Sequence, residues 1–147
     1  MAHIRKLIRD NINTTLTGLD TTAYNVYQSR VYPMHNAKLP GILIYNKLEN
    51  VEYSAMGVPR LQERTAEFEL QIYVKAKTDY DDKLDQICLE VEQALATDVT
   101  RGGYAIDTRV TTFESDFNGD GDQPVAICTL TVEVRYQVRE NDIDAAI

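Results

Sequence analysis

Histidine, cysteine and tryptophan are scarce in this 147-residue chain, which has two histidines, two cysteines and no tryptophan. A nucleophilic triad needs a serine or cysteine, a histidine and an orienting acid within reach of one another. His3 falls in a predicted helix and His35 in a loop after Pro33, and neither pattern brings a histidine to a cysteine. The sequence also has no cysteine–histidine spacing typical of zinc sites and no glycine-rich phosphate loop. We therefore expect no catalytic residue, no metal site and no cofactor, and predict that the protein is not an enzyme.

Long apolar runs are missing as well. No run approaches the roughly 20 residues needed to span a bilayer, and residues 1–9 lack the uninterrupted apolar segment of a signal peptide. We expect a protein that is made in the cytosol and has no membrane partner. Cys88 and Cys128 each fall on an apolar face, where a reduced cysteine behaves as a small hydrophobe. Buried thiols are the favoured interpretation, and a disulfide is the alternative because spacing alone does not decide pairing.

Positive charge is in short supply, since 23 acidic residues face 15 basic ones and the formal net charge is −8. Proteins that grip nucleic acid neutralise phosphates with lysine and arginine, so this balance disfavours DNA binding. An acidic channel through which DNA passes without sticking stays compatible with it. With 7 glycines, 4 prolines and no low-complexity stretch, the chain is expected to form one domain over residues 1–147.

Hydrophobic periodicity predicts an α+β fold. Apolar residues at spacings of three and four mark two helices, and alternation of apolar and polar residues marks most of the strands. In chain order the expected elements are a helix at 4–16, strands at 23–32, 42–45 and 67–76, a helix at 79–95, and strands at 109–117 and 125–138. The order α-β-β-β-α-β-β predicts a mostly antiparallel five-stranded sheet with two helices packed on one face.

Two segments lie outside this pattern. Residues 46–65 are too many for a tight turn between strands, so we expect a protruding hairpin or arm there. Residues 140–147 are acidic and then mildly apolar, and we expect a flexible tail. A strand-like extension onto a neighbouring subunit is the alternative for this tail.

The second face of the predicted sheet is polar. Alternation assigns to it a set of charged and amide side chains, namely Glu67, Glu69, Gln71, Lys75, Glu133, Arg135 and Gln137. Such a face is solvated or forms an interface, and it is not a second core. In a ring-forming protein it would be the natural wall to a neighbour or to the lumen.

One apparent metal motif spans residues 116–122. Its acidic and glycine residues match the start of a calcium loop, in which position 12 supplies a bidentate glutamate. Position 12 is here Ile127, inside a predicted strand. Asparagine, aspartate and glycine are also the residues that hairpin turns prefer, so a turn is the favoured interpretation. A small-ligand or calcium-binding module stays an alternative.

The order and spacing of these elements resemble the lambdoid phage tail terminator family, of the minor tail protein U type. The matching pieces are LPGILIY at 39–45, FELQIYV at 68–74, DKLD at 82–85, GY at 103–104 and LTVEVRY at 130–136. The resemblance extends from about residue 3 to residue 138. It implies a homohexameric ring on the last ring of the tail tube, at the head-proximal end of the virion tail. Such a ring stops tube polymerisation and provides the interface for head joining.

The resemblance implies partners but no transferable list of site residues. The implied partners are further copies of the chain, the tail tube protein and the head-completion or neck proteins, with DNA passing through the lumen. From this sequence itself we predict subunit or tail-tube contacts at Arg60, Glu63 and Arg64 of the arm, and at Glu67, Glu69 and Arg135 of the polar face. Another neck or tail-completion protein of the same virion, and an enzyme with an unrecognised site near His35, are further alternatives.

Overall fold

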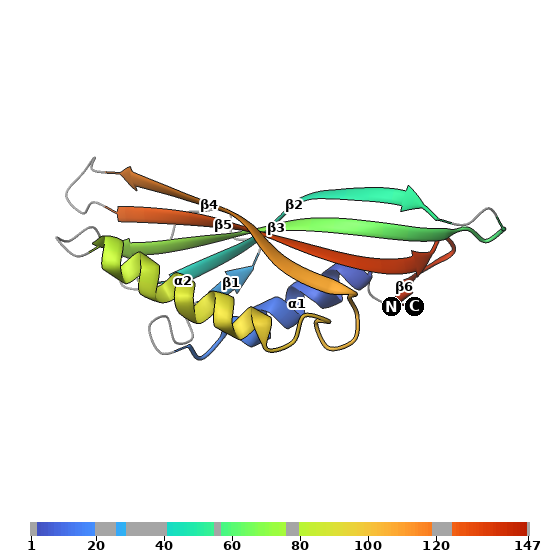
Figure 1. The fold of residues 1–147 in the computed structure, drawn as a ribbon, viewed down its shortest axis with the longest axis horizontal. Coiled ribbons are helices and arrows are strands. Elements are labelled where there is room, and N and C mark those ends of the chain that lie inside the picture. Colours follow the sequence, from blue (N-terminus) through green and yellow to red (C-terminus); the bar gives the residue numbers. More distant parts are fainter. Residues whose placement is uncertain are drawn as a thin grey trace.

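A long, mostly antiparallel sheet runs the length of the molecule, and both helices lie against the same face of it (Figure 1). The computed structural model describes residues 3–19, 26–28, 41–54, 57–75, 80–118 and 125–146. Within them the elements follow the order α1 (Ile4–Leu16), β1 (Val26–Gln28), β2 (Gly41–Tyr53), β3 (Leu61–Lys75), α2 (Tyr80–Ala96), β4 (Asp107–Asn118), β5 (Val125–Arg139) and β6 (Asp142–Ala146). The predicted α+β fold is therefore confirmed, and β6 is added at the end of the predicted order.

The strand order is β1-β2-β3-β5-β4, with β6 paired to β5. β1 pairs with β2 in parallel, and the other pairs are antiparallel. β3 and β5 form the centre, where fifteen residues pair in one register from Leu61↔Arg139 to Lys75↔Val125. This register places the apolar residues of both strands on one face, as their period of two requires.

The core lies between that face and the helices. α1 contributes Ile4, Ile8, Ile12 and Leu16, a strict i,i+4 stripe that is fully buried. The sheet adds buried apolar side chains to the same cluster, chiefly Phe68, Leu70, Ile72, Leu130, Val132 and Val134. Each such side chain contributes about 1.5–3 kcal/mol by leaving water. Tertiary packing of this kind holds a helix of 13 residues that would be marginal by itself.

The expected arm is an extension of the sheet. β2 continues to Tyr53 and β3 begins at Leu61, so residues 46–65 belong to a long hairpin. β5 pairs with the second strand of that hairpin as far as Arg139. We call residues 46–54 and 57–65 the distal hairpin. The early start of β3 was missed because Gln62 and Arg64 occupy inward positions at which alternation predicts apolar residues.

The C-terminal segment also differs from expectation. Where a flexible tail was predicted at 140–147, β6 occupies Asp142–Ala146 and pairs with β5 of its own chain. Ile143 packs against the core, which gives this strand an apolar attachment. The predicted strand at 23–32 is described only at Val26–Gln28, and His35, residues 76–79 and most of the 116–122 motif lie outside the described residues.

A buried arginine closes the C-terminal end of α2. The side chain of Arg101 is fully buried, and its Nη2 donates to the carbonyl oxygens of Leu95, at 2.5 Å, and Asp98. Arg101 has a φ of 50°, a left-handed conformation that side-chain-bearing residues seldom adopt. Its Nε and Nη1 find no hydrogen-bond partner in the described part of the chain. Burial accordingly lowers the pKa of the guanidinium.

Candidate interaction surface

The sheet face opposite the helices is polar and carries no helix among the described elements (Figure 1). We call it the outer face and define it by the outward residues of the three strands β3, β5 and β4: Glu63, Thr65, Glu67, Glu69, Thr131, Glu133, Arg135, Gln137, Arg109, Thr112 and Glu114. These positions alternate with the buried ones, so their side chains point away from the helices.

Charges on the outer face pair across strands. Lys47 Nζ lies 3.4 Å from Glu69 Oε1, Arg135 Nε lies 3.5 Å from Glu63 Oε1, and Arg109 Nη2 lies 3.6 Å from Glu133 Oε2. Exposed pairs of this kind each contribute about 0–1 kcal/mol. They leave the face acidic, because its carboxylates outnumber its cations.

Glu67 stands out on this face. It is directly opposite Glu133 in the β3–β5 register. No cation of the described residues lies within ion-pair distance of Glu67. Like charges in directly opposed positions destabilise a sheet by roughly 0.2–1 kcal/mol. The centre of the outer face therefore holds a carboxylate whose charge no cation of the described residues neutralises.

Four of the six predicted contact residues, Glu63, Glu67, Glu69 and Arg135, are together on the outer face. Of the other residues assigned to this face, Gln71 accepts from the Tyr73 hydroxyl at 2.9 Å, while the side chain of Lys75 lies outside the described part. The sequence pattern was sufficient to find this group, because alternation fixes which residues share a face.

Arg60 lies at the end of the distal hairpin. Its Nε is 3.0 Å from Glu140 Oε2, its backbone N–H donates to the other oxygen of that carboxylate at 3.0 Å, and its guanidinium lies 4.4 Å from the centre of the Tyr53 ring. The backbone hydrogen bond, with the side-chain bond and charge of Arg60, lowers the pKa of Glu140. Arg60 is thus half-exposed and held in place by contacts within the chain, and its predicted role in a subunit or tail-tube contact stays a prediction.

Arg64 does not belong to this surface. It is on the opposite side of β3 and is only 9% exposed. Nη1 forms an ion pair with Glu49 Oε2 at 3.0 Å, and Nε and Nη2 donate to Gln62 Oε1 at 3.1 and 2.8 Å. The predicted contact role of Arg64 is therefore wrong for the folded chain, since alternation places even-numbered β3 residues on the helix side of the sheet.

Glu49 is the centre of this buried polar network. Its side chain is 7% exposed and accepts from Arg5 Nη1 at 2.6 Å and from the Tyr136 hydroxyl at 2.6 Å, in addition to Arg64. Burial, followed by the bond to Glu49, raises the pKa of Tyr136. Sequence reasoning missed this network. The available signal was polar residues at inward positions of an alternating strand.

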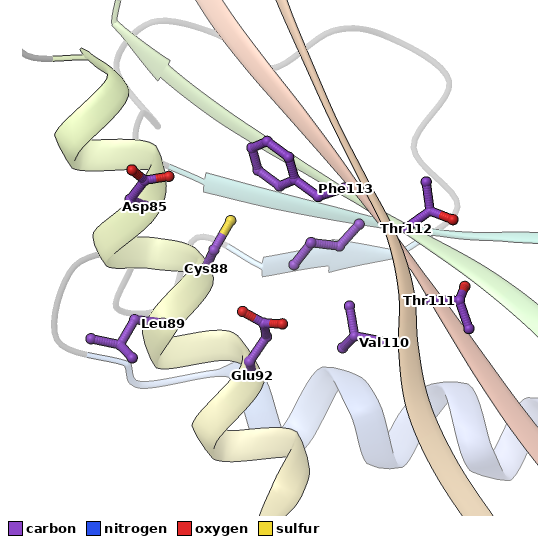
Figure 2. Close-up of a pocket in the computed structure, with 9 residues that line it drawn as sticks. Asp85, Cys88, Leu89, Glu92, Val110, Thr111, Thr112 and Phe113 are labelled. Atoms are coloured by element: carbon purple, nitrogen blue, oxygen red, sulfur yellow. The ribbon is translucent and has the colours of Figure 1, made fainter.

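A second surface is the open groove between α2 and β4, which we call the α2–β4 groove (Figure 2). It has a volume of about 490 Å³ and is lined by Asp85, Cys88, Leu89, Glu92, Val110, Thr111, Thr112, Phe113 and Leu130. Phe113 and Val110 project from β4 toward the helix. Leu89 is 48% exposed and Phe113 is 49% exposed, so the groove presents apolar surface to solvent. Sequence reasoning did not anticipate it.

Edge geometry explains why the groove is open. β4 ends the strand order, so one side of it has no partner among the described strands. Its register with β5 shifts between Val110 and Thr112, which marks a bulge. Bulges bend an edge strand and add twist. At this point the edge of the sheet and α2 leave apolar side chains uncovered between them.

The two cysteines lie at the base of this region. Cys88 Sγ is 3.5 Å from Cys128 Sγ, and both residues are buried, free thiols, as the favoured interpretation predicted. Their hydrogen bond lowers the pKa of Cys88 and raises that of Cys128, with burial adding to the second effect.

No three metal-ligating side chains gather within the described ranges. The helices of those ranges are too short or too polar to cross a bilayer.

Comparisons with known proteins give distant structural likenesses. No protein family description and no curated protein matches the sequence. Among solved structures, an uncharacterised protein is 18% identical with a TM-score of 0.49, over 88% of this chain and 94% of its own. A chain of the virion of a native gene transfer agent particle is 14% identical with a TM-score of 0.44, over 90% and 92%. The chain is thus similar, over most of its length, to a component of a gene transfer agent virion and to the uncharacterised protein.

Proposed function

We propose that this chain is a structural protein of a phage-like virion. In particular, we propose that it forms a ring on the end of the tail tube, stops tube polymerisation and provides the interface for head joining. The order and spacing of sequence elements that resemble the tail terminator family support this role. The single structural observation that carries it is the outer face, a broad polar sheet surface opposite a layer of two helices.

A ring through which DNA passes needs a wall to which phosphate does not adhere. The outer face supplies carboxylates from Glu63, Glu67, Glu69, Glu114 and Glu133, against the cations Arg109 and Arg135. Fixed negative charge repels the phosphate backbone and offers no site for counterion release. We therefore assign the outer face to the lumen of the ring. In this proposal the chain has no catalytic role.

Capping also requires that the two ends of the ring differ. The distal hairpin extends the sheet at one end of the molecule, and α2 begins near the other (Figure 1). A ring of such subunits presents unlike surfaces along its axis. One of these surfaces can be complementary to the tube end. The other can be non-complementary to a further tube ring and bind a neck protein.

The deciding experiment polymerises purified tail tube protein with and without this chain and measures tube length by electron microscopy. We expect short tubes that carry one ring at one end. Normal tube lengths without bound rings would contradict the capping role. Rings that bind only finished tails, and never arrest free tubes, would indicate another neck or tail-completion protein.

Charge variants refine this assay. Reversing Arg60 together with Glu63 should abolish capping and leave the fold intact, because both side chains are at least partly exposed. Lys6→Glu is the matched control, since the Lys6 side chain is exposed and its Nζ lies 2.7 Å from Asp10 Oδ2 of the same helix. If capping survived the double reversal, the distal hairpin would not contact the tube through these two residues.

A further inference from the structure

The distal hairpin ends in an exposed apolar surface. Val51 is 40% exposed, Tyr53 54% and Val58 88%, while Arg60 lies against the Tyr53 ring. Val51 and Tyr53 are opposite Arg64 and Gln62 in the register, so they lie on the helix side of the sheet. We call Val51, Tyr53, Val58 and Arg60 the hairpin plug. These side chains expose apolar area to water in the single copy, as surfaces that bind a partner do.

The α2–β4 groove offers a matching surface. Its apolar side chains, among them Leu89, Val110 and Phe113, also lie on the helix side of the sheet. Asp85 and Glu92 place two carboxylates along its wall. The plug brings apolar side chains and Arg60, which is half-exposed while it also pairs with Glu140 of its own chain, and the groove brings apolar side chains and two carboxylates. The two surfaces are therefore complementary in both polarity and charge.

A single copy cannot make this contact. Tyr53 is opposite Gln62 of β3, whereas Phe113 is opposite Leu130, which is opposite Leu70 of β3. Leu70 follows Gln62 by 8 residues, which is about 26 Å along the strand. Three strand spacings, about 14 Å, separate β2 from β4 across the sheet. Plug and groove are distant in one molecule, so the occupant must come from another.

We propose that the hairpin plug of one copy docks into the α2–β4 groove of the next copy. This inference rests on the ring in the proposed function and names its subunit interface. Val58 and Tyr53 cover Leu89 and Phe113, and Arg60 faces Asp85 and Glu92. Because different surfaces of the two copies meet, the contact is head-to-tail, and repetition of it gives the ring of the proposed function where the rotation between neighbours closes.

One-sided variants test the contact in the full-length chain. Tyr53→Asp/Val58→Asp damages the plug, and Asp85→Lys/Leu89→Asp damages the groove, all at exposed positions. Val99→Asp, at a 39% exposed apolar residue outside both surfaces, is the matched control. Sedimentation velocity over a wide range of protein concentration should give large assemblies for the wild type and the control, and monomers for each variant alone.

Mixing the two variants gives the sharpest result. Each keeps one intact surface, so an equimolar mixture should form a complex of twice the monomer mass and nothing larger. A fluorescent apolar probe, anilinonaphthalene sulfonate, should bind the groove of the plug variant and be released on mixing. Retention of the probe in the complex would overturn the proposal, because the groove would then be open to small ligands.

Two other outcomes overturn it. Variants that assemble like the wild type would show that the ring uses a different interface. A wild-type chain that is monomeric at every concentration would show that plug and groove do not associate. In either case the tube-capping assay still decides the proposed function separately, since arrest of tube growth does not depend on which surfaces join the subunits.

Discussion

Tyr136 of β5 donates its hydroxyl proton to Glu49 Oε1 of β2 at 2.6 Å, across the intervening strand β3. Arg64 of β3 reaches the other oxygen of the same carboxylate, and Arg5 of α1 joins it there. One carboxylate thus ties three strands and a helix together at the base of the distal hairpin. Gln62 and Arg64 occupy buried inward positions here, so hydrogen bonds and ion pairs join the hairpin to α1 and β5 at this place.

Glu49→Gln should lower the free energy of unfolding by about 3–5 kcal/mol, because it leaves the largely buried Arg64 without its counter-charge. Urea denaturation measures this loss. Asp10→Asn, which breaks the exposed Lys6–Asp10 pair, is the control and should change stability by less than about 1 kcal/mol. Equal effects of the two substitutions would show that the network contributes nothing beyond a surface pair.

His3 should make the stability of the chain depend on pH. Its Nδ1 accepts from the Arg5 backbone N–H at 3.0 Å at the start of α1, which requires the neutral ring. Burial, and then the charge of Arg5, lowers the pKa of His3 below its ordinary 6.5. The unfolded chain therefore binds more protons than the folded chain just below pH 6.5, and stability falls as the pH drops through that range.

His3→Asn tests this contribution, because asparagine keeps a side-chain acceptor at the cap but does not titrate. The free energy of unfolding, measured from about pH 7.5 to about pH 5, should decline more steeply for the wild type than for the variant. Parallel curves would mean that other groups cause the whole decline.

Cys88 and Cys128 should form an intramolecular disulfide when the chain is treated with diamide. The lowered pKa of Cys88 makes it the attacking thiolate, and the two thiols transfer two protons and two electrons to the oxidant. Thiol titration under denaturing conditions should show both groups lost together, without dimer formation. The Cys128→Ser variant, which retains only Cys88, should stay monomeric and form no disulfide between chains.

The disulfide should also stabilise the fold. It would close a loop of 40 residues, which contributes up to about 4 kcal/mol by restricting the unfolded chain. If both thiols were still titratable after diamide treatment, α2 and β5 would be holding the two sulfur atoms apart.

Removing the charge of Glu67 should stabilise the chain. Glu67→Gln ends the repulsion with Glu133 and should raise the free energy of unfolding by roughly 0.2–1 kcal/mol. The gain should shrink at high salt, where charges on the surface are screened. Glu69→Gln is the matched control, because it removes an equal charge that is already paired with Lys47 and should give no gain. A salt-independent gain would point to a cause other than charge.

Sequence periodicity predicted the elements whose apolar residues follow one repeat without interruption. Ile4, Ile8, Ile12 and Leu16 are such a set in α1, and the alternation from Ala126 to Val138 is another in β5. Packing on a single core demands these repeats, so they are visible in the chain itself. The outer face followed from the same rule, because the residues between buried ones must point away.

What escaped prediction depends on contacts between distant residues. Gln62 and Arg64 interrupt the apolar–polar alternation at the start of β3, so the sequence does not reveal that the strand begins there. Their burial is tolerated only where Glu49 and Tyr136 complete the network. Arg101 can be buried because its Nη2 donates hydrogen bonds to two carbonyl oxygens near the end of α2. The α2–β4 groove arises where an edge strand passes a helix, and no repeat in either segment marks that crossing.

The uninterrupted pairing of β3 with β5 has a mechanical consequence. Fifteen residues in one register extend about 50 Å, and hydrogen bonds run along the whole of that length. Such a sheet resists bending, so a force applied at one end of it is transmitted to the other end. In the ring proposed above, each subunit would therefore keep one shape under load, and the angle between neighbours would be set at the contacts between subunits.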